Sequence, residues 1–99
     1  MKKLTSAVLA AATLLAATPA FAGDDYRYYE QNRANFITHD AAAQKAVAAV
    51  GGGQAEDVEF DRDSRYGDVF EVDVRTTNGK YDVKIDAKTG AVVKKKLDN

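Results

Sequence analysis

Residues 69–86 read VFEVDVRTTNGKYDVKID, and the alternation of apolar and polar side chains on both sides of Asn78-Gly79 predicts a β-hairpin. An Asn-Gly pair suits a two-residue type I′ turn, because both residues tolerate a positive φ. The predicted cross-strand pairs are Val74 with Val83 and Val72 with Ile85 on one face, and Arg75 with Asp82 and Asp73 with Lys84 on the other. One face of the hairpin should therefore be buried, and the other should carry charges in water.

A strand is also predicted over Ala55–Asp61, where Val58 and Phe60 alternate with acidic residues. The connection that follows, Arg62–Asp68, is weakly similar to an EF-hand calcium loop, with Asp61, Asp63 and Asp68 as possible oxygen ligands. Arg65 stands where an oxygen donor belongs and no glutamate closes the loop, so we favour an ordinary hairpin loop. Calcium binding by these aspartates stays open as the alternative.

The last predicted strand follows the turn Asp86–Gly90 and reads AVVKKKL. Val93 and Leu97 are expected to point inward, and Lys94 and Lys96 to lie on the exposed face. Lys95 falls on the inner side, which is typical of an edge strand that is protected by charge against further pairing.

A helix is predicted from about His39 to Val50, with Thr38 as its N-cap and Gly51–Gly53 as its end. Its apolar arc consists of Ala42, Ala43, Ala46, Val47, Ala49 and Val50. Such a flat, alanine-rich face can lie close against a sheet. The predicted fold is therefore α+β, with one α-helix packed on one face of a four-stranded antiparallel β-sheet. The expected core is Val50, Val58, Phe60, Phe70, Val72, Val74, Val83, Ile85, Val93 and Leu97.

The first 22 residues have the pattern of a signal peptide: Lys2-Lys3, an apolar stretch over 4–17, and Ala20-Phe21-Ala22 as a cleavage signal. We expect cleavage after Ala22 and a periplasmic or secreted protein; an uncleaved membrane anchor is the less favoured alternative. The chain has no cysteine, so the domain must be stable without disulfides.

Residues 23–36 show no clean periodicity and are expected to form an extended or flexible lead-in. Arg27 and the tyrosines Tyr26, Tyr28 and Tyr29 could form a stacking platform, but rings that cover the edge of the core are the favoured interpretation. His39, the only histidine, is expected to pack at the helix start and not to act in catalysis or metal binding.

The composition argues against an enzyme. Ser64 is the only serine after residue 22 and has no glycine elbow, and cysteine chemistry is impossible. We therefore expect no catalytic, cofactor or metal residues and no cofactor. Cleavage would remove two lysines and no acid, which leaves a mildly acidic chain with no expected affinity for nucleic acid or membranes.

The order ITHDAAAQKAVAAVGG, VEFD and VFEVDVRTTNGKYDVKIDAKTGAVVKK resembles the PepSY domain family over Phe36–Leu97. The predicted domain is accordingly 37–97. Ala41 departs from the pattern, because many members have a glutamate there that completes a capping box. PepSY domains occur in propeptides of thermolysin-like metallopeptidases and in small exported proteins, so the resemblance implies restraint of peptidase activity.

No peptidase domain accompanies this sequence, so restraint is expected to act in trans, through the open sheet face or an edge strand. The resemblance supplies no motif of inhibitory residues, and the binding residues stay unassigned. The alternative function is a non-inhibitory envelope module that binds a partner protein, a cation or a small ligand on its exposed polar face.

Overall fold

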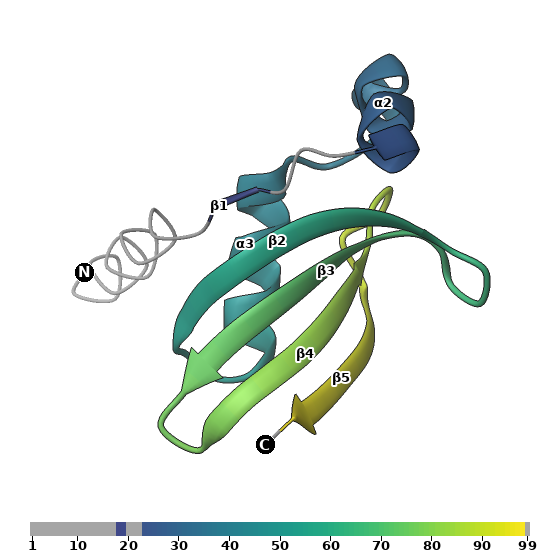
Figure 1. Ribbon diagram of the computed structural model, residues 1–99. Helices are drawn as coiled ribbons and strands as arrows, with labels where there is room; N and C mark the ends of the chain where they lie inside the picture. Colours follow the sequence, from purple (N-terminus) through teal and green to yellow (C-terminus); the bar gives the residue numbers. More distant parts are fainter. Residues whose placement is uncertain (1–17, 20–22, 99) are drawn as a thin grey trace, which may run out of the picture.

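The computed structural model describes residues 18–19 and 23–98, so the predicted signal peptide lies outside the described residues except for Thr18 and Pro19. Four strands form an antiparallel sheet in chain order: β2 (Gln54–Asp63), β3 (Gly67–Thr76), β4 (Gly79–Asp86) and β5 (Val92–Asp98). A two-residue strand, β1 (Thr18–Pro19), pairs in parallel with β2. Helix α3 (His39–Ala49) packs on one face of this curved sheet, which confirms the predicted α+β fold (Figure 1).

Helix α3 begins and ends where the sequence predicts. The Thr38 hydroxyl accepts a hydrogen bond from the Ala41 amide at 3.0 Å, which satisfies one of the free donors of the first turn. At the other end Gly51 has a φ of 83°, a conformation that glycine adopts without strain. The buried face consists of Ala42, Ala43, Ala46 and Val47. Val50 and Ala49 are only half-buried.

The β3–β4 hairpin reverses at the predicted place, but its register differs from the prediction by two residues. Asn78 has a negative φ and only Gly79 is positive, at 135°, so the turn is centred on Thr77-Asn78. The Thr76 hydroxyl stabilises this turn by accepting from the Asn78 amide and donating to the Gly79 carbonyl. The observed pairs are Phe70 with Ile85, Glu71 with Lys84, Val72 with Val83, and Asp73 with Asp82. The apolar residues still face α3, because a shift of two residues preserves the face of every side chain.

A second helix occupies the segment that was expected to be an extended or flexible lead-in. Helix α2 (Gly23–Gln31) and the short 3₁₀ helix η2 (Arg33–Asn35) precede α3, and α2 packs against β2 (Figure 1). The prediction was wrong because the segment is polar and depends on a few rings for its packing. Tyr29 is only 4% exposed, and its ring contacts Phe36, Phe60 and Phe70.

The core lies between α3, α2 and the inner face of the sheet. Its buried strand residues are Ala55, Val58, Phe60, Phe70, Val72, Val74, Val83 and Ile85, and Ala87 in the turn after β4 joins them. Leu97, predicted to be inside, is 40% exposed on the edge strand β5, and Val93 is half-buried. The β4–β5 pairing is irregular between Lys84 and Ile85, so β5 departs from simple alternation and its side chains lie at the margin of the core.

Candidate functional site

The face of the sheet opposite α3 is charged, and carboxylates predominate on β2 and β3 whereas lysines predominate on β4 and β5; Arg75 on β3 and Asp82 and Asp98 on β4 and β5 are the exceptions. Alternate residues of β2 and β3 place carboxylates on this open face, whereas β4 and β5 contribute mostly lysines. The acidic half comprises Asp57, Glu59, Asp61, Asp63, Glu71 and Asp73, and the lysines are Lys80, Lys84, Lys94 and Lys96. The described helices leave this face of the sheet uncovered.

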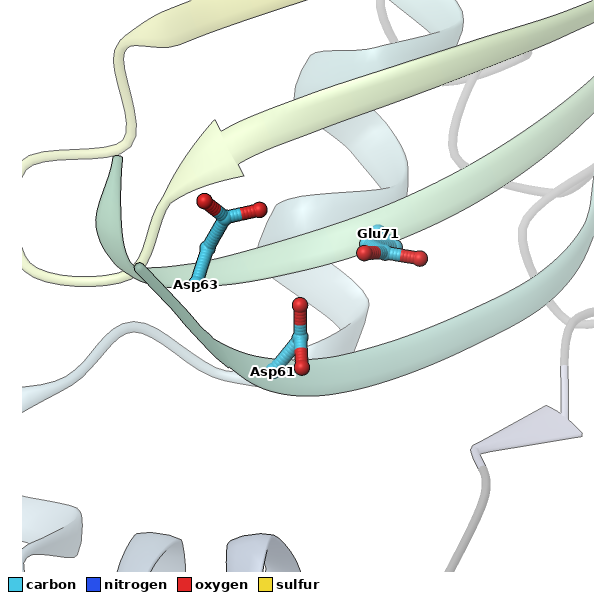
Figure 2. Close-up of side chains that lie close together, drawn as sticks. All are labelled: Asp61, Asp63 and Glu71. Atoms are coloured by element: carbon cyan, nitrogen blue, oxygen red, sulfur yellow. The ribbon is translucent and has the colours of Figure 1, made fainter. Parts of the chain in front are cut away.

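Three carboxyl groups of the acidic half converge near the β2–β3 loop. One oxygen from each of Asp61, Asp63 and Glu71 lies within 4.8 Å of the others (Figure 2). The Lys84 ammonium donates to Asp63 at 3.0 Å and to Glu71 at 2.9 Å. A side-chain cation of the chain therefore already compensates two of the three carboxylates.

The electrostatics of this cluster differ from one carboxyl group to the next. Hydrogen bonds from Lys84 and from the amides of Tyr66 and Arg65 lower the pKa of Asp63 to about 2. Burial, a hydrogen bond with Glu71 and the charge of that residue raise the pKa of Asp61 to about 6. Hydrogen bonds to Glu71 and Asp63 raise the pKa of Lys84, so its charge is maintained at any ordinary pH.

The β2–β3 connection is the hairpin loop that the sequence favours. Asp63 Oδ1 accepts from the amides of Arg65 at 2.7 Å and Tyr66 at 3.0 Å, an Asx-type turn. Of the aspartates considered for a calcium loop, Asp61 and Asp63 do come together. Asp68 instead accepts a hydrogen bond from the Tyr28 hydroxyl at 3.4 Å, and Glu71 takes the third place. Glu71 lies one strand away, so only the correct strand register could have identified it.

A shallow hollow of about 240 Å³ lies beside this cluster on the same face. Asp57 and Glu59 of β2 and Glu71 and Asp73 of β3 line it. Burial raises the pKa of Asp73, and the carboxylates of Asp82, Asp57 and Glu71 add to this rise against the opposing charge of Lys80. Four acidic side chains around one hollow therefore produce a concentrated negative potential.

Two tyrosines of the segment 23–36, Tyr28 and Tyr29, cover the core and do not form an open platform. Tyr28 stacks on Phe60 with ring centroids 6.2 Å apart, and the Arg62 guanidinium lies 4.1 Å from the centroid of the Tyr28 ring. The Tyr29 hydroxyl donates to the Ile37 carbonyl. Arg27 is exposed and forms an ion pair with Asp24 at 3.9 Å. The packing interpretation is confirmed for Tyr28 and Tyr29, whereas Tyr26 is half-buried outside the core cluster and Arg27 is exposed.

His39 also packs as expected. Its ring meets those of Tyr29 and Phe70 edge-on, with centroids 5.1 Å and 4.9 Å away, and burial lowers its pKa. A hollow of about 440 Å³ opens beside it between α2 and the start of α3, and Tyr26, Glu30, Arg33 and Asp40 also line this hollow. Two carboxylates and one guanidinium line this hollow, so both signs of charge are present. The lining therefore favours neither an anionic nor a cationic ligand.

The lysines of β5 have two roles. Lys95 points to the inner side, as predicted, and its ammonium donates to the Ala49 carbonyl at 3.2 Å, where a cation complements the C-terminal end of α3. Lys94 and Lys96 pair with Lys84 and Asp82 across the sheet and lie on the open face. The basic run is thus an edge of the sheet that also caps a helix.

Among residues 18–19 and 23–98, no helix combines the length and apolar character that a membrane span needs. The family model described as "Peptidase propeptide and YPEB domain", PepSY, matches residues 36–96, which is more than half of the chain. No curated protein and no solved structure matches the chain. The matched range begins at Phe36 and covers α3, β2, β3, β4 and most of β5, close to the range over which the sequence resembles the family. The chain therefore belongs to the PepSY family.

Proposed function

We propose that this protein is an exported, non-catalytic binding module that restrains a peptidase of the cell envelope or the extracellular space. The observation that carries the proposal is the family match over residues 36–96, because the family takes its description from the propeptides of peptidases. The match covers α3 and the antiparallel sheet as far as Lys96, whereas α2 lies before it. The module as a whole, and not one segment of it, is therefore the part expected to act.

The arrangement of the fold supports binding to another protein. Helix α3 covers one face of the sheet, and the open face presents ordered charges on regular strands. Charges held on a rigid sheet steer association and select partners of complementary charge. Binding without chemical change requires nothing more than such a surface.

The test is a peptidase assay. The purified protein is incubated with each metallopeptidase of the same envelope, and turnover of a fluorogenic peptide is measured alongside direct binding. We expect one or more of these enzymes to bind the protein and to lose activity in a saturable way. Absence of both binding and inhibition across the whole set would contradict the proposal.

A second candidate is a module that binds an envelope component without inhibition, and the separation of charges on the open face favours it. An acidic half and a basic half can recognise many partners, including a sensor protein, an assembly factor or a small charged ligand. Affinity capture from envelope extract distinguishes the two functions. Recovery of a defined partner that is not a peptidase, with peptidase turnover unchanged, would support this candidate.

A further inference from the structure

The two edges of the sheet differ in what they offer a partner. On β5, Lys94–Lys96 place three cations at the edge, and Lys95 is tied to the end of α3. On β2, the side chains that point to the open face are acidic. Strand β1 pairs in parallel with β2 at Asp57 and Val58. The outer edge of β2 thus accepts an added strand within this chain.

We propose that the outer edge of β2 around residues 57–59 is a docking site for an extended segment of a partner protein that carries Lys or Arg at alternate positions. The inference rests on the proposed function, because it identifies the surface by which the module binds. The partner segment extends the sheet by one strand and pairs its basic side chains with the acidic half of the open face.

The backbone is the first source of affinity. A strand added at a sheet edge gains main-chain hydrogen bonds that do not depend on its sequence. Thr18 and Pro19 lie opposite Asp57 and Val58, so a segment that occupies their place runs parallel to β2. If residues 1–22 are removed on export, as the sequence predicts, this stretch loses the neighbour that the structure describes there.

Helix α2 sets one limit to the open stretch. Asp25 Oδ2 accepts from the Arg62 amide at 3.4 Å, and α2 packs against β2 near that point. Near the C-terminal end of β2, this carboxylate therefore accepts the amide hydrogen bond that an added strand would otherwise accept. The usable edge therefore precedes Arg62 and coincides with the most acidic part of the strand.

The side chains are the source of selectivity. Successive side chains of an added strand alternate between the two faces, so every second one lies beside Asp57 and Glu59 and the 240 Å³ hollow that they line with Glu71 and Asp73. A basic side chain there relieves the repulsion among these carboxylates. An acidic side chain would increase it, which gives discrimination by charge.

The experiment measures binding of a short synthetic peptide in which lysine alternates with threonine and valine. The probe is titrated into the isotopically labelled full-length chain and into a chain that begins at Gly23, and backbone amide shifts are recorded. The largest shifts are expected at residues 57–59. Binding should be several-fold tighter in the shorter chain, since β1 no longer competes; the full-length chain carries the test if the shorter one does not fold.

Matched charge variants test the acidic half of the site. Asp57→Asn with Glu59→Gln and the control Asp82→Asn with Asp98→Asn remove the same number of negative charges from the open face. We expect about tenfold weaker binding in the first and less than about twofold in the control. Equal losses in the two variants, shifts centred on β5, or equal binding of a peptide with glutamate in place of lysine would overturn the proposal.

The same variants separate this inference from the proposed function. Peptidase restraint that is unchanged by Asp57→Asn with Glu59→Gln overturns the docking site and leaves the function standing. Peptide binding at residues 57–59 with no peptidase restrained supports the docking site and counts against the function.

Discussion

Gly52 and Gly53 have nearly the same φ angle and very different surroundings. Their φ angles are 125° and 123°, which a residue with a Cβ rarely adopts. A Cβ on Gly52 would meet nothing within 4 Å, whereas one on Gly53 would lie 2.5 Å from the Arg75 carbonyl oxygen. The segment between α3 and β2 therefore requires glycine for conformation at both positions, and at Gly53 for space as well.

This difference predicts unequal costs for the same substitution. Gly52→Ala should lower the free energy of unfolding by about 1 kcal/mol, from backbone strain alone. Gly53→Ala should cost about 3 kcal/mol, because the backbone of β3 must also move. Urea denaturation of the two variants measures the difference, and equal losses would contradict the predicted contact with Arg75.

The raised pKa of Asp61 leads us to expect an unusual dependence of the protein's stability on pH. Its folded pKa is about 6, above the ordinary value of 3.8, so between these values the folded state holds a proton that the unfolded chain has released. Its carboxylate therefore destabilises the fold at neutral pH, and this effect is relieved as the pH falls through about 6 towards 3.8. Asp61→Asn should raise the free energy of unfolding by about 1 kcal/mol at pH 7, and the gain should vanish below the unfolded pKa.

Asp63 is the matched control, because its pKa is shifted in the opposite direction, to about 2. The pKa of Asp63 is lower in the folded state than in the unfolded chain. Its carboxylate therefore stabilises the folded state above pH 3.8, and this stabilisation is lost as the pH falls towards 2. Asp63→Asn should destabilise the protein at pH 7. Thermal unfolding at several pH values tests both variants, and stabilisation by neither or by both would refute the assignment.

Lys84 is expected to stabilise the whole carboxylate cluster. Its side chain is 13% exposed and bonds two carboxylates, so Lys84→Met leaves Asp63 and Glu71 next to Asp61 without their cation. We expect a loss of about 2 kcal/mol by urea denaturation. Lys80→Met, on the same face of β4, should cost much less, and a comparable loss there would point to general charge balance instead of these two bonds.

At the level of secondary structure, the turn decides the details of the hairpin. Alternation placed Val72, Val74, Val83 and Ile85 correctly on the inner face, but Asn78 keeps a negative φ and shifts the pairing by two residues. Lys84 consequently pairs with Glu71 and not with the predicted Asp73. The alternation along each strand predicts that these carboxylates point to the open face. It does not predict which of them come together, because that depends on the register of the strands.

Helix α2 was missed for a related reason. Its sequence is polar throughout, and its stability comes from rings that meet residues distant in the chain, chiefly Phe60 and Phe70. Helix propensity depends on residues close in the sequence, so it does not reveal contacts with distant residues. By contrast, α3 has its N-cap, its alanine face and its terminal glycines within one short stretch, and all three were predicted.

Helix α2 is accordingly expected to depend on a single buried ring. Tyr29→Ala should lower the free energy of unfolding by about 3 kcal/mol, because it removes a ring that is 4% exposed and leaves a cavity. Arg27→Ala, in the same helix but exposed, should change it by less than about 0.5 kcal/mol. Similar small effects in both variants would mean that α2 does not contribute to the fold.

For the whole molecule, the aromatic contacts predict that both helices and the sheet unfold together. The rings of Tyr28 and Tyr29 in α2 contact Phe36 before α3 and Phe60 in β2, and His39 of α3 contacts Phe70 in β3. No described element is joined to the rest by charges alone. Small domains with one continuous core usually unfold in a single transition.

Thermal unfolding should therefore give the same midpoint, within about 2 °C, by near-ultraviolet circular dichroism of the tyrosines and by far-ultraviolet circular dichroism of the backbone. In Tyr29→Ala the two midpoints should fall together, by several degrees for each kcal/mol lost. Loss of the tyrosine signal at a lower temperature, with the backbone signal retained, would show that α2 detaches first. The open stretch of β2 would then extend beyond Arg62, because the hydrogen bond from its amide to Asp25 would be lost with the helix.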